Sequence, residues 1–211
     1  MLPAAVLTNL DELTKLTEEA SVALALAEFY NPEKLSFLGV HNELRNALFH
    51  VMKMVEVRDK KDEKNEFKAY NNEFNAAKSH LRRAGCDAYE LLCISCIKDI
   101  EGLLVKYDHE DITIAFPGYY EIRKTALEVK HKVAEMKQNK DLKSKSVETL
   151  FEHYFNQAAL LIEHVKRINE YIPAIIEIQR EKRKKKWKEQ LISVGIAVVI
   201  AAVAFVLGKL T

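Results

Sequence analysis

Three residues in one short stretch, Arg45, Asn46 and His50, have side chains suited to acid–base chemistry on a phosphodiester. A histidine can take a proton from an attacking hydroxyl or give one to a leaving oxygen. An arginine can hold a phosphate through two parallel hydrogen bonds and stabilise the charge that develops on it. Arg45 and His50 are five residues apart, about 140° around a helix, so both reach one groove if another helix or a second subunit lies between them. Asn46 lies one turn before His50 and is placed to orient it.

The stretch from Arg45 through Asn46 to His50 resembles the motif of the HEPN family, in which an arginine and a polar residue precede a histidine by a few positions. Residues 80–89 resemble the following long helix in some members of that superfamily. The resemblance implies a helical bundle, often a dimer that places two motifs in one cleft. In many members it also implies a metal-independent endoribonuclease, so RNA is an expected partner. Arg82 and Arg83 are weaker candidates for phosphate contacts.

Two hypotheses about the function follow from this resemblance. The first is an endoribonuclease that acts in stress or in defence against invading genetic elements, with Arg45, Asn46 and His50 as its catalytic residues. The second is a non-catalytic helical interaction or sensor protein with the same fold. Neither reading calls for a cofactor, and no metal ligand set is expected.

Other residues that could bind metal or act as nucleophiles do not form a complete site. Cys93 and Cys96 make a single CxxC, whereas a structural zinc site needs four ligands. Together with Cys86, they are interpreted as reduced thiols that pack as small apolar residues. Glu128 and His131 have the ExxH spacing of di-iron bundles, but such sites need a second pair and two further carboxylates.

Apolar residues recur every three or four positions along most of the chain, which predicts amphipathic helices. The expected helices cover residues 9–30, 39–57, 66–107 and 118–138, and a fifth begins near residue 146. The apolar face of the fifth is wide, which favours burial in a bundle over a narrow coiled-coil seam. Residues 109–117, with the β-branched patch Ile112–Ile114, are predicted to be a connection.

The C-terminal residues 191–208 carry no charge, and eighteen helical residues span about 27 Å, close to the ~30 Å hydrocarbon core of a bilayer. The preceding stretch, residues 180–189, has a net charge of +5 and contains Trp187, features typical of a cytoplasmic membrane flank. The expected membrane-anchoring residues are Trp187, Leu191, Ile192, Val194, Ile196, Val198, Val199, Ile200, Val203, Phe205, Val206 and Leu207.

The sequence therefore predicts an all-α, single-pass integral membrane protein with the lipid bilayer as a partner. A cytoplasmic helical bundle of about five helices (1–179) is followed by a basic juxtamembrane stretch (180–189), a transmembrane helix (190–208) and a short tail (209–211). The chain has a net charge of +1, but residues 1–179 alone carry −5, which is unlike a general nucleic-acid binder. Small residues at every fourth position, Ser193, Ala197 and Ala201, favour a homo-oligomer.

Overall fold

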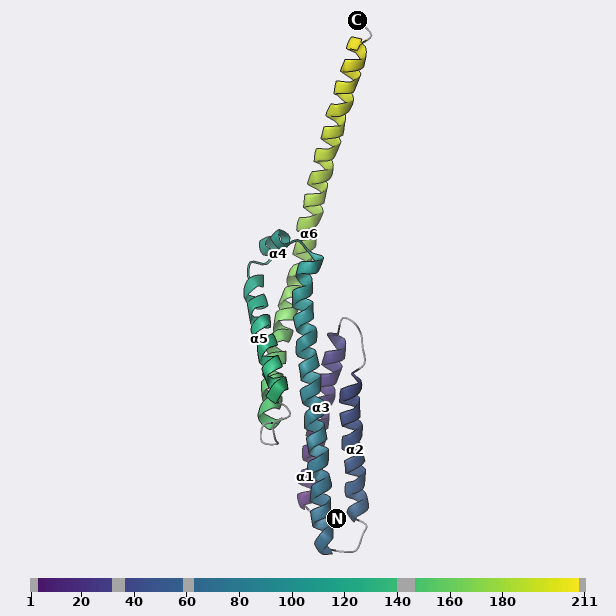
Figure 1. Cartoon of the computed structure of the whole chain (residues 1–211), viewed down its shortest axis with the longest axis vertical. Coiled ribbons are helices and arrows are strands. Elements are labelled where there is room, and N and C mark those ends of the chain that lie inside the picture. The colour runs from purple at the N-terminus through teal and green to yellow at the C-terminus, as the bar shows by residue number, and fades with distance from the viewer. Residues whose placement is uncertain (1–3, 32–36, 59–62, 140–146, 209–211) are drawn as a thin grey trace. The chain divides into compact units, whose positions relative to one another are not determined.

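The computed structural model describes residues 4–31, 37–58, 63–139 and 147–208, and this part of the chain is almost entirely α-helical. Its helices are α1 (Ala4–Phe29), α2 (Leu38–Arg58), α3 (Glu63–Lys106), α4 (His109–Ala115), α5 (Tyr119–Asn139) and α6 (Val147–Gly208), as Figure 1 shows. The predicted all-α class is confirmed, and the five expected helices correspond to α1, α2, α3, α5 and α6.

The short helix α4 was not expected, because its β-branched residues favoured a connection. The backbone of Asp108 is extended and its carbonyl accepts a hydrogen bond from the N–H of Ile112 at 3.1 Å, which closes the first turn. Ile112 and Asp111 are buried, so tertiary packing outweighs the weak helix propensity of the β-branched patch.

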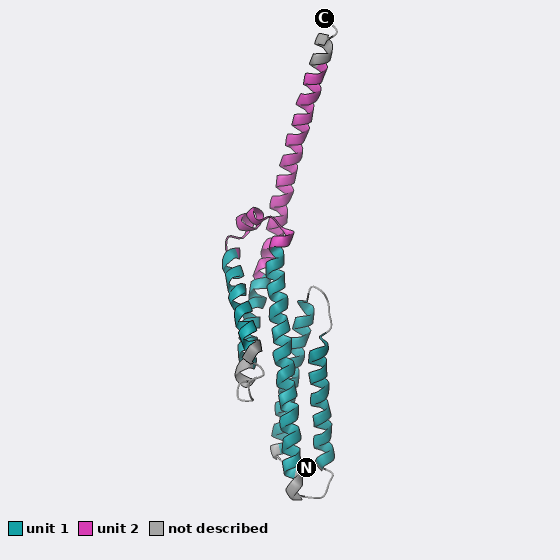
Figure 2. Ribbon diagram, in the orientation of Figure 1, with its two compact units in different colours: residues 1–103, 120–166 teal, residues 104–119, 167–211 magenta. Residues whose placement is uncertain are grey.

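The chain falls into two compact units, each formed by segments far apart in the sequence (Figure 2). Unit 1 comprises residues 1–103 and 120–166. In its first half, α1, α2 and α3 lie side by side around one apolar cluster (Figure 1). The buried members of that cluster are Leu13, Ala47, Met54, Tyr70, Phe74, Ala77 and Leu81.

The second half of unit 1 is formed where α3 meets α5 and the first part of α6. The Tyr89 ring of α3 contacts two phenylalanine rings of α6 edge-on, Phe151 at 5.4 Å and Phe155 at 5.6 Å between centroids. Lys130 of α5 donates to Glu101 of α3 at 3.0 Å. The long helix α3 is thus the element that α1 and α2 share with α5 and α6.

Unit 2 comprises residues 104–119 and 167–211, so α4 packs against the later part of α6. The Phe116 ring stacks on that of Tyr171 with 4.2 Å between centroids, and the guanidinium of Arg167 lies 5.4 Å from the Phe116 ring. Lys182 pairs with Glu110 at 2.6 Å and with the buried carboxylate of Asp111 at 2.8 Å.

The predicted transmembrane helix over residues 190–208 is wrong. In the part of the chain that the structure describes, no helix has an apolar stretch long enough to cross a bilayer. Described side chains of the apolar run extend from Leu191 to Ala202, about 18 Å of helix against a ~30 Å hydrocarbon core, and the polar residues Lys188, Glu189 and Gln190 precede them. The single-pass membrane location with a cytoplasmic N-terminal domain is overturned by the same finding.

Of the expected anchoring residues, those up to Ile200 lie in the described part of α6, and Val203, Phe205, Val206 and Leu207 lie outside the described side chains. The described ones are exposed by 52–65%. Ser193, Ala197 and Ala201 lie within this exposed stretch, and a homo-oligomer formed through them stays a prediction.

Candidate active site

A ladder of histidines and glutamates joins α2 to α3 in unit 1. Glu43 and His50 are seven residues apart on α2, and Glu73 and His80 have the same spacing on α3. Seven residues make about two helical turns, so each pair lies on one face of its helix. The two helices run antiparallel, and each glutamate therefore meets the histidine of the other helix, giving the pairs His50–Glu73 and His80–Glu43.

The His50 pair is short and partly shielded from solvent. Nδ1 of His50 lies 2.6 Å from Oε2 of Glu73, and the two side chains are 21% and 23% exposed. A carboxylate only accepts hydrogen bonds, so Nδ1 donates its proton and Nε2 keeps a free lone pair. This arrangement fixes the tautomer and the orientation of the His50 ring.

His80 has two different partners at the same nitrogen. Its Nδ1 lies 2.7 Å from Oε2 of Glu43, which can only accept, and 2.8 Å from Nη2 of Arg83, which can only donate. In the neutral ring with Nδ1 accepting from Arg83, the proton lies on Nε2; in the imidazolium both nitrogens carry protons, and Nδ1 donates to Glu43. The His80 and His50 rings stack with 5.2 Å between centroids and 19° between planes.

Glu43 holds the His80 side of the ladder together. Arg83 donates from Nε to Oε2 of Glu43 at 3.0 Å and from Nη1 to Ser79 at 3.2 Å. Partial burial raises the pKa of Glu43, but the hydrogen bonds from His80 and Arg83 outweigh burial, so the pKa lies below its ordinary value. Glu43 is therefore a charged anchor for Arg83 and His80.

The structure brings together only part of the residues that the sequence selected. His50 and Arg83 belong to the ladder. Arg45 is exposed on α2, and Asn46 is half-buried there with no hydrogen bond to the ladder among the described residues. Arg82 contacts Glu12 of α1 at 3.9 Å, and burial lowers the pKa of its guanidinium. Sequence reasoning missed the roles of Glu43, Glu73 and His80, although the repeated seven-residue spacing from glutamate to histidine was a usable signal.

The cysteines are buried in α3 as free thiols, which confirms their interpretation as small apolar residues. Burial raises the pKa of Cys93 far above its ordinary value and that of Cys96 to about 12, so neither is a thiolate near neutral pH. Within the described ranges, no three His, Cys, Asp or Glu side chains are grouped so that they could hold a metal ion.

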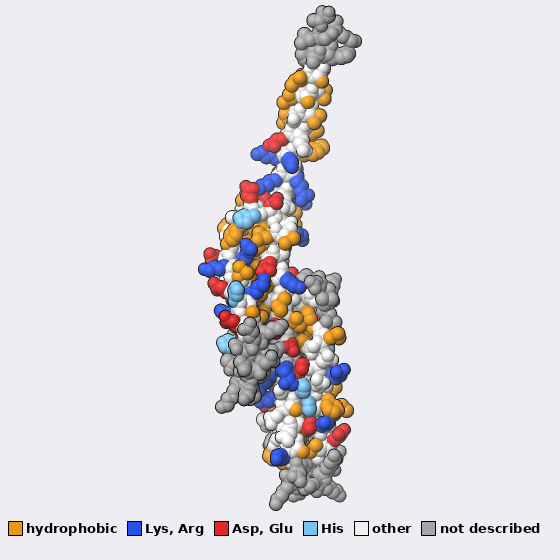
Figure 3. Space-filling view, in the orientation of Figure 1, with side chains coloured by type: hydrophobic (Ala, Val, Ile, Leu, Met, Phe, Trp, Pro, Cys, Tyr) orange, Lys and Arg blue, Asp and Glu red, His pale blue; other side chains and the backbone are white. Residues whose placement is uncertain are grey.

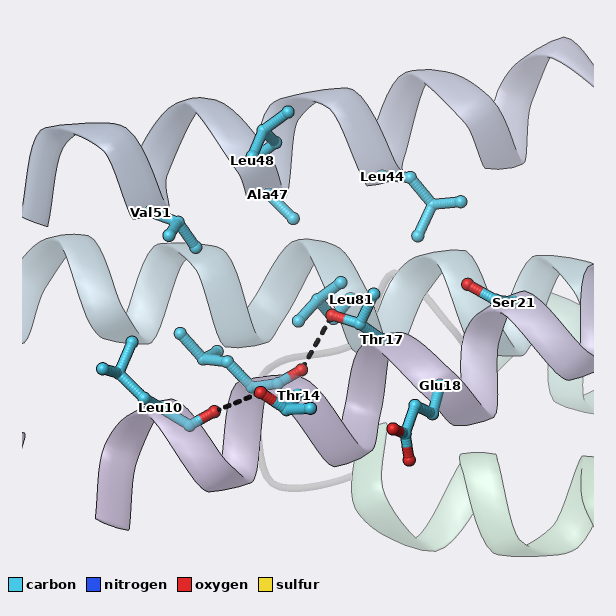
Figure 4. Close-up of a pocket in the computed structure, with 11 residues that line it drawn as sticks. Leu10, Thr14, Thr17, Glu18, Ser21, Leu44, Ala47, Leu48, Val51 and Leu81 are labelled. Carbon is cyan, nitrogen blue, oxygen red and sulfur yellow. Dashed lines mark hydrogen bonds between the residues drawn. The ribbon is translucent and has the colours of Figure 1, made fainter. Parts of the chain in front are cut away.

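An apolar groove of about 390 Å³ lies between α1 and α2, with Leu81 of α3 at its base (Figure 4). Leu44, Ala47, Leu48 and Val51 line it from α2. Leu10, Leu13, Thr14, Thr17, Glu18 and Ser21 line it from α1. The hydroxyls of Thr14 and Thr17 donate to carbonyl oxygens one turn earlier, so the groove is apolar in spite of them.

Comparison with family models, with curated proteins and with solved structures found no match for this chain. The resemblance to the HEPN family therefore stays a prediction that rests on the residues of the motif.

We expect Glu43→Gln to destabilise the fold near neutral pH and to have a smaller effect near pH 3. The folded-state pKa of Glu43 is lowered, so its charge stabilises the fold above the unfolded-state pKa, and this contribution is lost as the pH falls through the folded-state pKa. The expected loss near pH 7 is about 1–2 kcal/mol, measured by urea unfolding followed by circular dichroism. The exposed Glu163→Gln serves as control, and equal destabilisation at both pH values would contradict the assignment.

Proposed function

We propose that this protein cleaves RNA without a metal ion, and that His50 and His80 move the protons. The observation that carries the proposal is the stacked histidine pair, in which each imidazole has a glutamate within 2.7 Å of Nδ1. Two imidazoles with ordered Nδ1 partners are the equipment that acid–base cleavage of a phosphodiester requires. The resemblance to the HEPN motif, which contains His50, adds support from the sequence.

The proposed reaction is attack of the ribose 2′-oxygen on the neighbouring phosphorus. His50 takes the 2′-hydroxyl proton on Nε2, because its Nδ1–H is held by Glu73. The bond from phosphorus to the 5′-oxygen breaks as the new bond forms. His80, in its imidazolium form with Nδ1–H donated to Glu43, gives its Nε2 proton to that leaving oxygen and is left as a neutral ring. The products are a 2′,3′-cyclic phosphate and a 5′-hydroxyl, and both histidines then return to their starting protonation states by exchange with water.

Arginine supplies the charge that this reaction needs at the phosphate. The Arg83 guanidinium contacts His80 and is 42% exposed, so it can meet a phosphate while anchored to Glu43. Arg45 is also exposed on α2, about 140° around the helix from His50, so its proposed role as a second phosphate contact requires a second subunit at this face. A charged donor aimed at the developing negative charge contributes most in the transition state.

The test is an RNA cleavage assay with analysis of the product ends. We expect the full-length protein to cleave single-stranded RNA in the presence of EDTA and to leave 2′,3′-cyclic phosphate ends, because the proposed steps use only imidazole and guanidinium groups. Loss of cleavage on chelation, or products with 3′-hydroxyl ends, would contradict the proposed chemistry. Intact RNA from a broad panel would remove the ribonuclease function altogether.

A second candidate is a non-catalytic interaction protein, and the groove between α1 and α2 favours it. The groove faces run for about three helical turns, the length over which an amphipathic helix presents apolar residues to a partner. On this proposal Leu48→Glu abolishes binding of a partner helix while His50→Ala leaves it intact. On the ribonuclease proposal, His50→Ala should impair cleavage much more than Leu48→Glu does.

A further inference from the structure

A second group of charged residues lies on α6 in unit 2, far along the chain from the histidine ladder. Residues 180–188 hold seven Lys or Arg and one Glu, and all nine are exposed. Figure 3 shows Lys and Arg side chains gathered on this part of α6, just before the exposed apolar stretch. We call residues 183–188 the basic segment.

Part of this positive charge is neutralised inside the unit. Arg180 pairs with Glu177 at 2.8 Å, Lys184 pairs with Glu181 at 2.5 Å, and Lys182 pairs with Glu110 and Asp111. Four other cations form no ion pair within 4.0 Å among the described residues, namely Arg183, Lys185, Lys186 and Lys188. Arg183 donates a hydrogen bond to the neutral side chain of Gln179 at 3.5 Å. The basic segment is therefore a local excess of accessible positive charge.

An aromatic ring lies among these free cations. Trp187 is 65% exposed and follows Arg183 by four residues, so the two side chains lie on one face of α6. Arg183 and Lys186 also line a hollow of about 190 Å³, whose other lining residues are Lys182, Gln179 and the two acidic residues Asp108 and Asp111. An exposed indole between cations provides a flat surface for a nucleobase and charges for the phosphates on either side of it.

We propose that the basic segment binds single-stranded RNA and so holds the substrate of the proposed ribonuclease. The choice of RNA as the ligand rests on that proposed function. The positive charge and the exposed indole are features of α6 that do not depend on it. At about 100° per residue the four free cations are distributed all round the helix. A flexible strand can pass around such a helix, whereas a flat lipid surface meets cations on one side only, so the arrangement favours RNA over an anionic membrane.

The affinity should depend strongly on salt. Four phosphate contacts to a single strand give a slope of about −3 in a plot of log K against log salt concentration. Stacking of one base on Trp187 adds a sequence-tolerant contribution, and its removal should weaken binding about 10-fold. Binding should therefore weaken with added salt and quench the fluorescence of Trp187, which is the only tryptophan in the chain.

The test is a fluorescence anisotropy titration of labelled oligouridine with the full-length chain carrying His50→Gln and His80→Gln, so that RNA is not consumed. Adding Arg183→Glu, Lys185→Glu, Lys186→Glu and Lys188→Glu should weaken binding at least 100-fold. The matched control reverses four other exposed lysines, Lys68, Lys124, Lys132 and Lys166, which lie on α3, α5 and α6. The control should retain most of the affinity in spite of an equal change in net charge.

Three outcomes would overturn the inference: no RNA binding, an equal loss in the control variant, or binding to phosphatidylserine vesicles with none to RNA. Cleavage by the wild-type chain, measured separately, keeps the two proposals apart. RNA that is bound through the basic segment but never cleaved would support this inference and remove the ribonuclease function. If RNA is cleaved but the four charge reversals leave its binding unchanged, the ribonuclease function is supported and this inference is overturned.

Discussion

Replacing His50 or His80 with alanine is expected to slow RNA cleavage by about 10²–10⁴-fold, the usual contribution of a positioned general acid or base. Each substitution removes the nitrogen that exchanges a proton with the substrate and leaves Glu73 or Glu43 without its imidazole partner. Arg45→Ala and Arg83→Ala are expected to cost about 10²–10³-fold, the usual loss for one charge-stabilising donor. The measurement is the single-turnover rate on a labelled single-stranded RNA at saturating protein.

Two controls separate chemistry from folding in this experiment. His131 is an exposed histidine of α5, and His131→Ala should leave the cleavage rate unchanged. Far-ultraviolet circular dichroism should show the same helical content for every variant. Wild-type cleavage by the His80→Ala protein would overturn the proposed roles of the two histidines, because the leaving oxygen would then have no proton donor. Full activity in His50→Ala would place the chemistry outside the ladder.

The second large effect concerns Gly85 of α3, which is expected to resist even the smallest side chain. A Cβ added there would collide with the Phe151 ring of α6, and that ring is also held edge-on against Tyr89. Gly85→Ala should therefore lower the free energy of unfolding by about 1–3 kcal/mol, although alanine by itself favours a helix interior. The measurement is urea unfolding followed by circular dichroism.

Gly102 provides the matched control, because it lies in the same helix and a Cβ added there meets no atom within 4 Å. Gly102→Ala should stabilise the fold by about 0.5–1 kcal/mol through helix propensity alone. Combining Gly85→Ala with Phe151→Leu should recover part of the lost stability, since the smaller side chain leaves room for the new methyl group. Stabilisation by Gly85→Ala on its own would show that α3 and α6 do not approach closely at this position.

The periodicity of apolar residues was sufficient to predict the long helices, because a helix that buries one face must repeat that face every three to four residues. It was not sufficient for α4. Asp111 is fully buried, and its ion-pair partner Lys182 lies on α6, 71 positions later by the residue numbers. A helix of seven residues that depends on such a distant contact has no local pattern to reveal it. The apolar composition of residues 191–208 was likewise not sufficient, because it predicted a transmembrane helix that the described part of the chain does not contain.

The sequence by itself determined that His50 lies on a helix and that an arginine, an asparagine and several glutamates lie near it along the chain. Only the antiparallel register of α2 and α3 decided that His50 meets Glu73 and stacks on His80. Arg82 and Arg83 are neighbours in the sequence, but consecutive helical residues point about 100° apart, so their side chains meet different helices. Arg82 turns toward Glu12 of α1 and Arg83 toward Glu43 of α2. Residue type is local information, but the partner of a charged side chain depends on which helices pack together and at what offset.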